Sequence, residues 1–128
     1  MKYLPTFCLI VLFAAVSIAA DHTKDSLATV KQNIENKKAV LVDVREKSEW
    51  DEGHVKGAIF LPLSGLRDGI TPDKLKPLPK GKIIYLHCVV GQRAKVAGSL
   101  LEKYNYKVRP LKPGYDEIIS AGFPKADK

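Results

Sequence analysis

Apolar and polar positions along the chain alternate between two periodicities. Compact apolar or β-branched runs, the pattern of buried strands, occupy residues 39–42, 58–61, 83–87 and 106–111. Stretches with apolar residues at helical spacing separate these runs, and the clearest contain Leu27, Val30 and Ile34 before the first run and Val96, Ala97, Leu100, Leu101 and Tyr104 after the third. This order predicts an α/β fold around a mostly parallel sheet.

Capping and turn residues set the expected ends of the helices. Asp25 or Ser26 can cap the first helix, and residues 46–52 form a short helix that Gly53 stops. Residues 64–70 are expected to form a helical turn, and residues 115–121 the last helix. Residues 71–81 are rich in proline and lysine, which favours a surface connection.

Residues 1–20 have the layout of a secretory signal peptide. Lys2 is their only charge, an almost unbroken apolar segment covers residues 7–16, and small residues precede Asp21. We expect cleavage after Ala19 or Ala20 and a periplasmic or secreted protein. No stable membrane insertion is expected afterwards, because the apolar segment is too short for a comfortable transmembrane helix. Residues 21–128 then form one ordinary domain, which we expect to be a monomer.

The charge of the chain limits its partners. The net charge is +7, but the lysines are scattered and no aromatic residues are interleaved with them at a stacking spacing. This pattern argues against nucleic acid as a partner. It is compatible with an attraction for small anions.

The segment from residue 83 to residue 94 concentrates the candidate chemistry. Cys88 is the only cysteine of residues 21–128 and lies where a buried strand passes into a helix. The first N–H groups of a helix favour an anion, so a thiol at this junction is pushed toward thiolate, and Arg93 adds positive charge. Gly91 permits positive φ, which lets several amides turn toward one point. We therefore expect an ionised sulfur that is open to small molecules.

Four separated motifs resemble the single-domain rhodanese family. They are Asp43-Val44-Arg45, residues 53–59 leading to Pro62-Leu63, the loop from Cys88 to Arg93, and the tail with Gly114-Tyr115 and residues 121–124. The resemblance implies a five-stranded parallel sheet flanked by helices on both faces, and sulfurtransferase activity without a cofactor. It implies that Cys88 accepts a sulfane sulfur from a donor such as thiosulfate and passes it, as a persulfide, to cyanide, a thiol or a protein acceptor.

Each residue of the loop has an expected role in this chemistry. Cys88 is the nucleophile, and a covalent intermediate on it predicts ping-pong kinetics. The backbone amides from Val89 to Arg93 and the Arg93 side chain form a cradle for the anion, so we assign substrate binding to Val89, Val90, Gly91, Gln92 and Arg93. Sulfur-containing anions are the expected small-molecule partners.

The loop departs from thiosulfate-using rhodaneses, which usually carry a cation or a polar residue just after the cysteine. Val89 and Val90 add no charge for a dianion, so a persulfide or polysulfide is a better donor candidate than thiosulfate. Ala94 replaces a common serine and Ile118 a frequent tryptophan, which we interpret as packing variation.

Two other functions remain open. The domain can carry or sense sulfur for a partner protein rather than catalyse turnover. Cysteine phosphatases and arsenate reductases also place a Cys and an Arg on such a loop, but with five residues between them. Here only residues 89–92 intervene, and this shorter ring suits a sulfur atom better than a phosphoryl group.

Other polar residues have supporting or structural interpretations. Asp43 and Arg45 end a strand beside the expected site, where they pair with one another or brace the loop. His54 is expected in a structural turn, His87 in the core or a hydrogen bond, and Trp50 in the core or a lid. The histidines and Cys88 lack the spacing of a zinc site, so no metal is expected.

Overall fold

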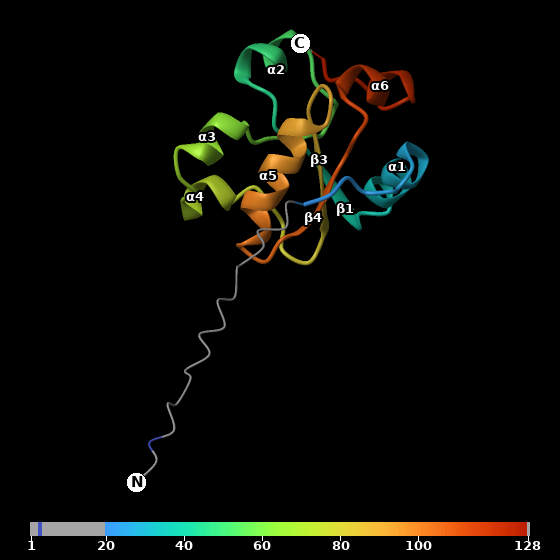
Figure 1. Cartoon of the computed structure of the whole chain (residues 1–128). Helices are drawn as coiled ribbons and strands as arrows, with labels where there is room; N and C mark the ends of the chain where they lie inside the picture. Colours follow the sequence, from blue (N-terminus) through green and yellow to red (C-terminus); the bar gives the residue numbers. More distant parts are fainter. Residues whose placement is uncertain (1–2, 4–19, 128) are drawn as a thin grey trace.

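The computed structural model describes residues 3 and 20–127, which fold around one parallel sheet (Figure 1). Its four strands are β1 (Ala39–Asp43), β2 (Ile59–Phe60), β3 (Ile83–His87) and β4 (Lys107–Pro110). Their order across the sheet is β2-β1-β3-β4, and every neighbouring pair is parallel. The carboxyl ends of all four strands therefore lie at one edge, where open α/β sheets bind their ligands.

Helices cover both faces of the sheet. On one face lie α1 (Leu27–Glu35) and α6 (Tyr115–Ser120), and on the other lie α3 (Leu63–Arg67), α4 (Pro72–Leu75) and α5 (Gln92–Glu102) (Figure 1). The short helix α2 (Lys47–Glu52) follows β1. The period-2 alternation of β3 fills both cores, because Ile84 and Leu86 pack on the α5 side while Tyr85 packs on the α1 side.

Local sequence explains how the main helices begin. Ser26, one of the two predicted caps, accepts a hydrogen bond from the Thr29 amide at the start of α1. Glu46 and Glu49 form a reciprocal capping box at α2. The helix α5 begins after Gly91, whose φ of 88° lies in the left-handed region that favours glycine.

The described residues contain four strands, whereas the family resemblance implied five. Beside the edge strand β4, residues 20–25 make one backbone hydrogen bond to it, from Thr23 N–H to Pro110 O at 2.8 Å. A single bond does not make the repeated ladder that defines a strand. The α/β class, the parallel sheet and the helices on both faces are as predicted.

Two smaller expectations also change. Residues 71–81 are not only a surface connection, because Pro72 begins the short helix α4 and Leu78 is buried in the core. The helix α5 ends at Glu102, so Tyr104 lies beyond it and is 40% exposed.

The predicted signal peptide lies outside the described residues except for Tyr3 and Ala20. Among the described residues, no helix combines the length and apolarity needed to cross a bilayer.

Candidate active site

The loop for which the sequence predicts an anion cradle lies where β3 passes into α5. His87 is the last residue of β3, Gly91 caps α5, and the backbone turns between them. The amide N–H of Gly91 donates a hydrogen bond to the Cys88 Sγ at 3.1 Å. Gly91 itself has a left-handed φ, as the sequence predicted for a glycine at this point, and this turn leads the chain into α5.

The sulfur is not open to solvent, and this corrects the sequence-based expectation. Cys88 has 0% exposed surface and belongs to the core cluster that contains Leu86 and Ala97. The physical reason is that the alternation of β3 continues for one more residue, which points Cys88 to the same side as Leu86. The next two residues face outward, since Val89 is 46% and Val90 is 72% exposed.

A second loop, after β4, holds the cysteine loop from the opposite side. The Tyr115 amide donates to the Cys88 carbonyl at 2.9 Å. Gly114 lies so close that a Cβ placed on it would be 2.5 Å from the carbonyl carbon of Val89 and closer still to its oxygen. Gly114 is therefore required by the close approach of two backbones, and any side chain there would displace the cysteine loop.

Arg93, in the first turn of α5, makes a bidentate ion pair. Its Nη1 and Nη2 donate to the two carboxylate oxygens of Glu49 at 2.6 and 2.9 Å, and both side chains are about one-third exposed. This hydrogen bonding lowers the pKa of Glu49 to about 2. The pKa of Arg93 is raised, first by the Glu49 hydrogen bonds and also by negative charge on Cys88.

Asp43 and Arg45 form a buried pair at the end of β1. The guanidinium of Arg45 donates to both carboxylate oxygens of Asp43 at 2.8 to 3.1 Å, and its Nη2 donates to the Gly53 carbonyl at 2.7 Å. It also lies over the ring of Tyr115, with its central carbon 4.2 Å from the ring centroid. The sequence left open whether Asp43 and Arg45 pair with one another or brace the cysteine loop. The two side chains pair directly, and the contact of Arg45 with the loop passes through Tyr115.

The three residues with structural interpretations occupy defined places. His87 is fully buried, with Nε2 3.6 Å from the Asp43 carboxylate and neither ring nitrogen within a hydrogen bond of a described residue. Burial lowers the pKa of His87. The side chain of His54 is held by α2, because its ring stacks on Trp50 at 3.6 Å and its Nδ1 contacts the Trp50 carbonyl at 3.1 Å.

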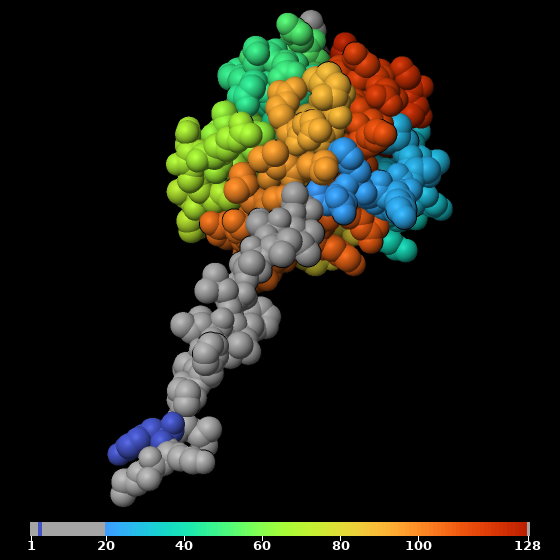
Figure 2. Space-filling view, in the orientation of Figure 1, coloured from blue at the N-terminus to red at the C-terminus, as the bar shows by residue number. Residues whose placement is uncertain are grey.

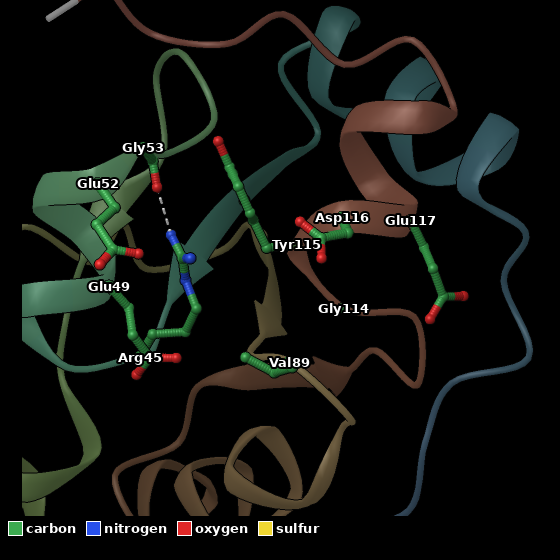
Figure 3. Close-up of a pocket in the computed structure, with 9 residues that line it drawn as sticks. All are labelled: Arg45, Glu49, Glu52, Gly53, Val89, Gly114, Tyr115, Asp116 and Glu117. Carbon is green, nitrogen blue, oxygen red and sulfur yellow. Dashed lines mark hydrogen bonds between the residues drawn. The ribbon is translucent and has the colours of Figure 1, made fainter.

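A cavity of about 400 Å³ opens beside the cysteine loop (Figure 3). Its lining consists of Arg45, Glu49, Glu52, Gly53, Val89, Gly114, Tyr115, Asp116 and Glu117. Four of these residues are acidic and one is basic, and Arg45 is already paired with Asp43. The cavity reaches the cysteine loop at Val89, the residue after Cys88, but Cys88 itself does not line it.

Some of the predicted site residues lie together in the structure, and others lie at the exposed edge of the site. Cys88, Gly91 and Arg93 share one loop, whereas Gln92 is exposed at the first position of α5. Ala94 and Ile118, the two departures interpreted as packing variation, are both fully buried. Within residues 3 and 20–127, no three His, Cys, Asp or Glu side chains are grouped as metal ligands.

Two contributors to the site were not singled out from the sequence. Glu49 was assigned only to a short helix, and its partner Arg93 is 44 residues away. Its capping-box spacing from Glu46 was visible but says nothing about that partner. His22 was considered only as a metal ligand, yet its Nε2 lies 2.9 Å from the Gly91 carbonyl. No local pattern signals such a contact.

Comparison with known proteins identifies relatives for most of this chain. The family description "Rhodanese-like domain" matches residues 26–121. The thiosulfate:glutathione sulfurtransferase of Saccharomyces cerevisiae is 31% identical over 97 residues, which cover 69% of this chain and 70% of that protein. The "Putative sulfur carrier protein YrkF" of Bacillus subtilis is 28% identical over 83 residues, covering 64% of this chain and 42% of that protein. The match spans less than half the length of several curated relatives.

Solved structures show the same architecture. A rhodanese-related protein from Thermoplasma volcanium has a TM-score of 0.64 at 26% identity, covering 85% of this chain and 98% of that one. A thiosulfate sulfurtransferase from Pseudomonas aeruginosa has a TM-score of 0.68 at 17% identity, covering 86% of this chain and 20% of that one, and this likeness concerns the fold alone. With its parallel sheet, its cysteine loop and a family match over residues 26–121, the chain belongs to the rhodanese-like domain family.

Proposed function

We propose that this protein transfers a sulfane sulfur through a persulfide on Cys88. The observation that carries the proposal is the hydrogen bond from Gly91 N–H to the Cys88 Sγ, 3.1 Å long, at the start of α5. The amide and the positive end of the helix both favour a negative sulfur. Arg93, in the first turn of the same helix, adds a positive charge that it shares with Glu49.

The proposed transfer has two balanced steps. In the first, the Cys88 thiolate attacks the outer sulfur of the donor, a sulfur–sulfur bond forms, and the donor's own bond to that sulfur breaks. The electron pair of the broken bond leaves with the remainder of the donor, which is sulfite when the donor is thiosulfate. In the second, a thiolate or cyanide attacks the outer sulfur of the persulfide and restores the Cys88 thiolate. Negative charge stays on sulfur throughout, so the same amide serves both steps.

The surroundings of the loop support a persulfide or polysulfide as donor rather than thiosulfate. The cavity beside Val89 presents four carboxylates and one arginine; the arginine is paired with Asp43 and one carboxylate, that of Glu49, with Arg93, which leaves a negative lining. A dianion such as thiosulfate is repelled by such a lining more strongly than a persulfide or a short polysulfide that carries a single negative charge. The apolar side chains of Val89 and Val90 add no compensating charge.

Access to the sulfur is the main requirement of this proposal. Because Cys88 has no exposed surface, the donor reaches it only when the loop shifts outward. The exposed pair Val89 and Val90 is the part of the loop that faces solvent, and the cavity lies directly against Val89. A buried thiol of purely structural role is inert, so reaction with a small donor is itself a test.

A sulfur carrier is the second candidate, and the burial of Cys88 favours it. A buried persulfide is protected until a partner protein displaces the loop, and one relative is named as a putative sulfur carrier. A turnover assay with excess donor and excess thiol acceptor distinguishes the two functions. A catalyst produces many equivalents of product per chain, whereas a carrier makes one stoichiometric transfer and stops.

We also propose that the protein acts in the periplasm or after secretion. Support for this comes from residues 1–20, whose apolar segment and small residues before Asp21 have the layout of a signal peptide. N-terminal sequencing of the protein recovered from cells tests the proposal. A chain that begins at Ala20 or Asp21 agrees with it, and an intact Met1 contradicts it.

Mass spectrometry of the intact chain tests the sulfur chemistry most directly. Incubation with an inorganic polysulfide should add about 32 Da, one sulfur atom, to the wild type. The matched control is Cys88→Ser, which removes the sole cysteine of the domain and leaves a hydroxyl that can still accept from Gly91 N–H. A folded wild-type chain that never gains the added mass refutes both the enzyme and the carrier.

A further inference from the structure

The carbonyl oxygen of Gly91 has a second partner that comes from the other end of the domain. His22 Nε2 lies 2.9 Å from this oxygen, and the Lys95 amide donates to the same oxygen at 3.2 Å within α5. A carbonyl oxygen accepts two hydrogen bonds and donates none, so His22 must carry its proton on Nε2. The imidazole also covers the glycine, because a Cβ placed on Gly91 would be 2.6 Å from that nitrogen.

The segment that carries His22 is anchored on both sides of it. Ala20 N–H donates to the Ser99 hydroxyl in α5 at 2.9 Å, and Thr23 N–H donates to the Pro110 carbonyl in β4 at 2.8 Å. Figure 2 shows this blue segment lying against the orange surface of α5. The imidazole is therefore presented to Gly91 from a fixed backbone rather than from a free chain end.

We infer that His22 is a positioning residue for the cysteine loop, acting through Gly91. The inference rests on the proposed function and adds to it a residue outside the family match, which begins at residue 26. Glycine has more backbone freedom than any other residue type, yet the N–H of Gly91 must keep its hydrogen bond to the Cys88 sulfur for the cradle to exist. A hydrogen bond to its carbonyl and a ring against its Cα restrict that freedom from outside the loop.

The contact also ties the cysteine loop to the processing of the chain. Cleavage after Ala19 or after Ala20 keeps His22 in the mature protein, so the contact with Gly91 survives either event. Cleavage after Ala20 removes one of the two anchors, because the bond to Ser99 comes from the Ala20 amide. Processing that removed His22 would release Gly91.

Three variants of the full chain test this role. His22→Ala removes the donor, His22→Gln replaces it with an amide N–H at about the position of Nε2, and Asp21→Ala is a control at an exposed neighbour. Two quantities are measured on each: the hydrogen-exchange rate of the Gly91 amide by nuclear magnetic resonance, and the single-turnover rate of persulfide formation with polysulfide. Thermal unfolding of each variant reports on general stability.

The expected pattern is specific to positioning. His22→Ala should speed exchange of the Gly91 amide and slow persulfide formation, each by about fivefold to tenfold, the effect of one hydrogen bond. His22→Gln should restore both rates to within about twofold of wild type, and Asp21→Ala should change neither. A wild-type exchange rate in His22→Ala, or a His22→Gln chain no better than His22→Ala, overturns the inference. If the wild type forms no persulfide, the proposed function fails, and the exchange rates alone decide the role of His22.

Discussion

Arg93 donates two hydrogen bonds to the carboxylate of Glu49, at 2.6 and 2.9 Å, although 44 residues separate them. The pair joins α2, which follows β1, to the first turn of α5, which follows β3. It also fixes the position of the Arg93 guanidinium. Both the contribution of this ion pair to the stability of the fold and its effect on the proposed reaction can be measured.

The first prediction concerns acid stability. Hydrogen bonding to Arg93 lowers the pKa of Glu49 from 4.5 to about 2. Because the folded-state pKa is depressed, the carboxylate stabilises the fold above pH 4.5, and this contribution is lost as the pH falls toward 2. Glu49→Gln should remove this part of the pH dependence of the free energy of unfolding. The amount is about 1 kcal/mol at most, because both side chains are partly exposed.

Urea unfolding at several pH values measures this effect. Asp73→Asn is a suitable control, since Asp73 pairs with Lys76 at 3.4 Å but both side chains are highly exposed. The control should follow the wild type throughout. Equal acid sensitivity of the wild type and Glu49→Gln between pH 4.5 and 2 would show that the pair contributes nothing.

The second prediction separates the charge of Arg93 from its geometry. Arg93→Ala should slow persulfide formation in the first half-reaction by about 10- to 100-fold, as for a charged hydrogen-bonding group worth roughly 1.5 to 3 kcal/mol. Arg93→Lys keeps the charge but cannot pair with both oxygens of Glu49. A lysine variant faster than the alanine variant assigns the effect to charge. Equal rates for both assign it to the paired geometry, and a wild-type rate in Arg93→Ala removes Arg93 from the reaction.

The third prediction tests the close approach of the two loops. Gly114→Ala should destabilise the fold by about 2 kcal/mol or more, because the new Cβ would be 2.8 Å from the Val89 Cα and closer to its carbonyl. It should also abolish persulfide formation in chains that still fold. Gly65→Ala in α3 is the matched control, since its Cβ would meet nothing nearer than 3.8 Å. We expect that control to be neutral or stabilised by about 0.5–1 kcal/mol.

Chemical unfolding and the mass-spectrometric assay together measure this prediction. The critical comparison is between the two alanine variants, because the added methyl group meets the Val89 backbone at one site and open space at the other. Gly114→Ala with the stability and persulfide yield of Gly65→Ala would mean that the two loops do not restrain each other.

The fourth prediction concerns the buried histidine. Burial lowers the pKa of His87 below its ordinary value of 6.5, so the folded state binds a proton less readily than the unfolded state. Stability from this group is therefore present above pH 6.5 and falls as the pH drops below it, by up to about 1.4 kcal/mol per pH unit. His87→Leu, which removes two unpartnered ring nitrogens, should lose this slope between pH 6.5 and 5. Unchanged pH dependence in that range would indicate that His87 is charged or solvated in the fold.

Sequence patterns predicted those features that depend on local order. The apolar runs located all four strands, the alternation with helices predicted the parallel sheet, and Gly91 marked the turn that aims an amide at Cys88. These features follow from periodicity and backbone sterics, which act over a few residues. The pairing of Asp43 with Arg45 was within reach for the same reason, since only Val44 lies between them at the end of one strand.

Contacts between distant segments were not visible in the same way. Nothing near Arg93 indicates that Glu49 is its partner, and nothing near Gly91 indicates His22. The burial of Cys88 was also missed, because its place at the junction of strand and helix predicted an open sulfur, whereas the cysteine follows the alternation of β3 into the core. Such contacts depend on how helices pack on the sheet, and that packing is decided by the whole chain.

The cysteine loop is held by residues from both ends of the domain. His22 contacts Gly91 from near the start, and the Tyr115 amide contacts Cys88 from near the finish. A chain synthesised only as far as α5 therefore contains the Cys88 thiol but not all of the residues that hold its loop. The frame around Cys88 is therefore complete only once synthesis has passed α6, the last helix.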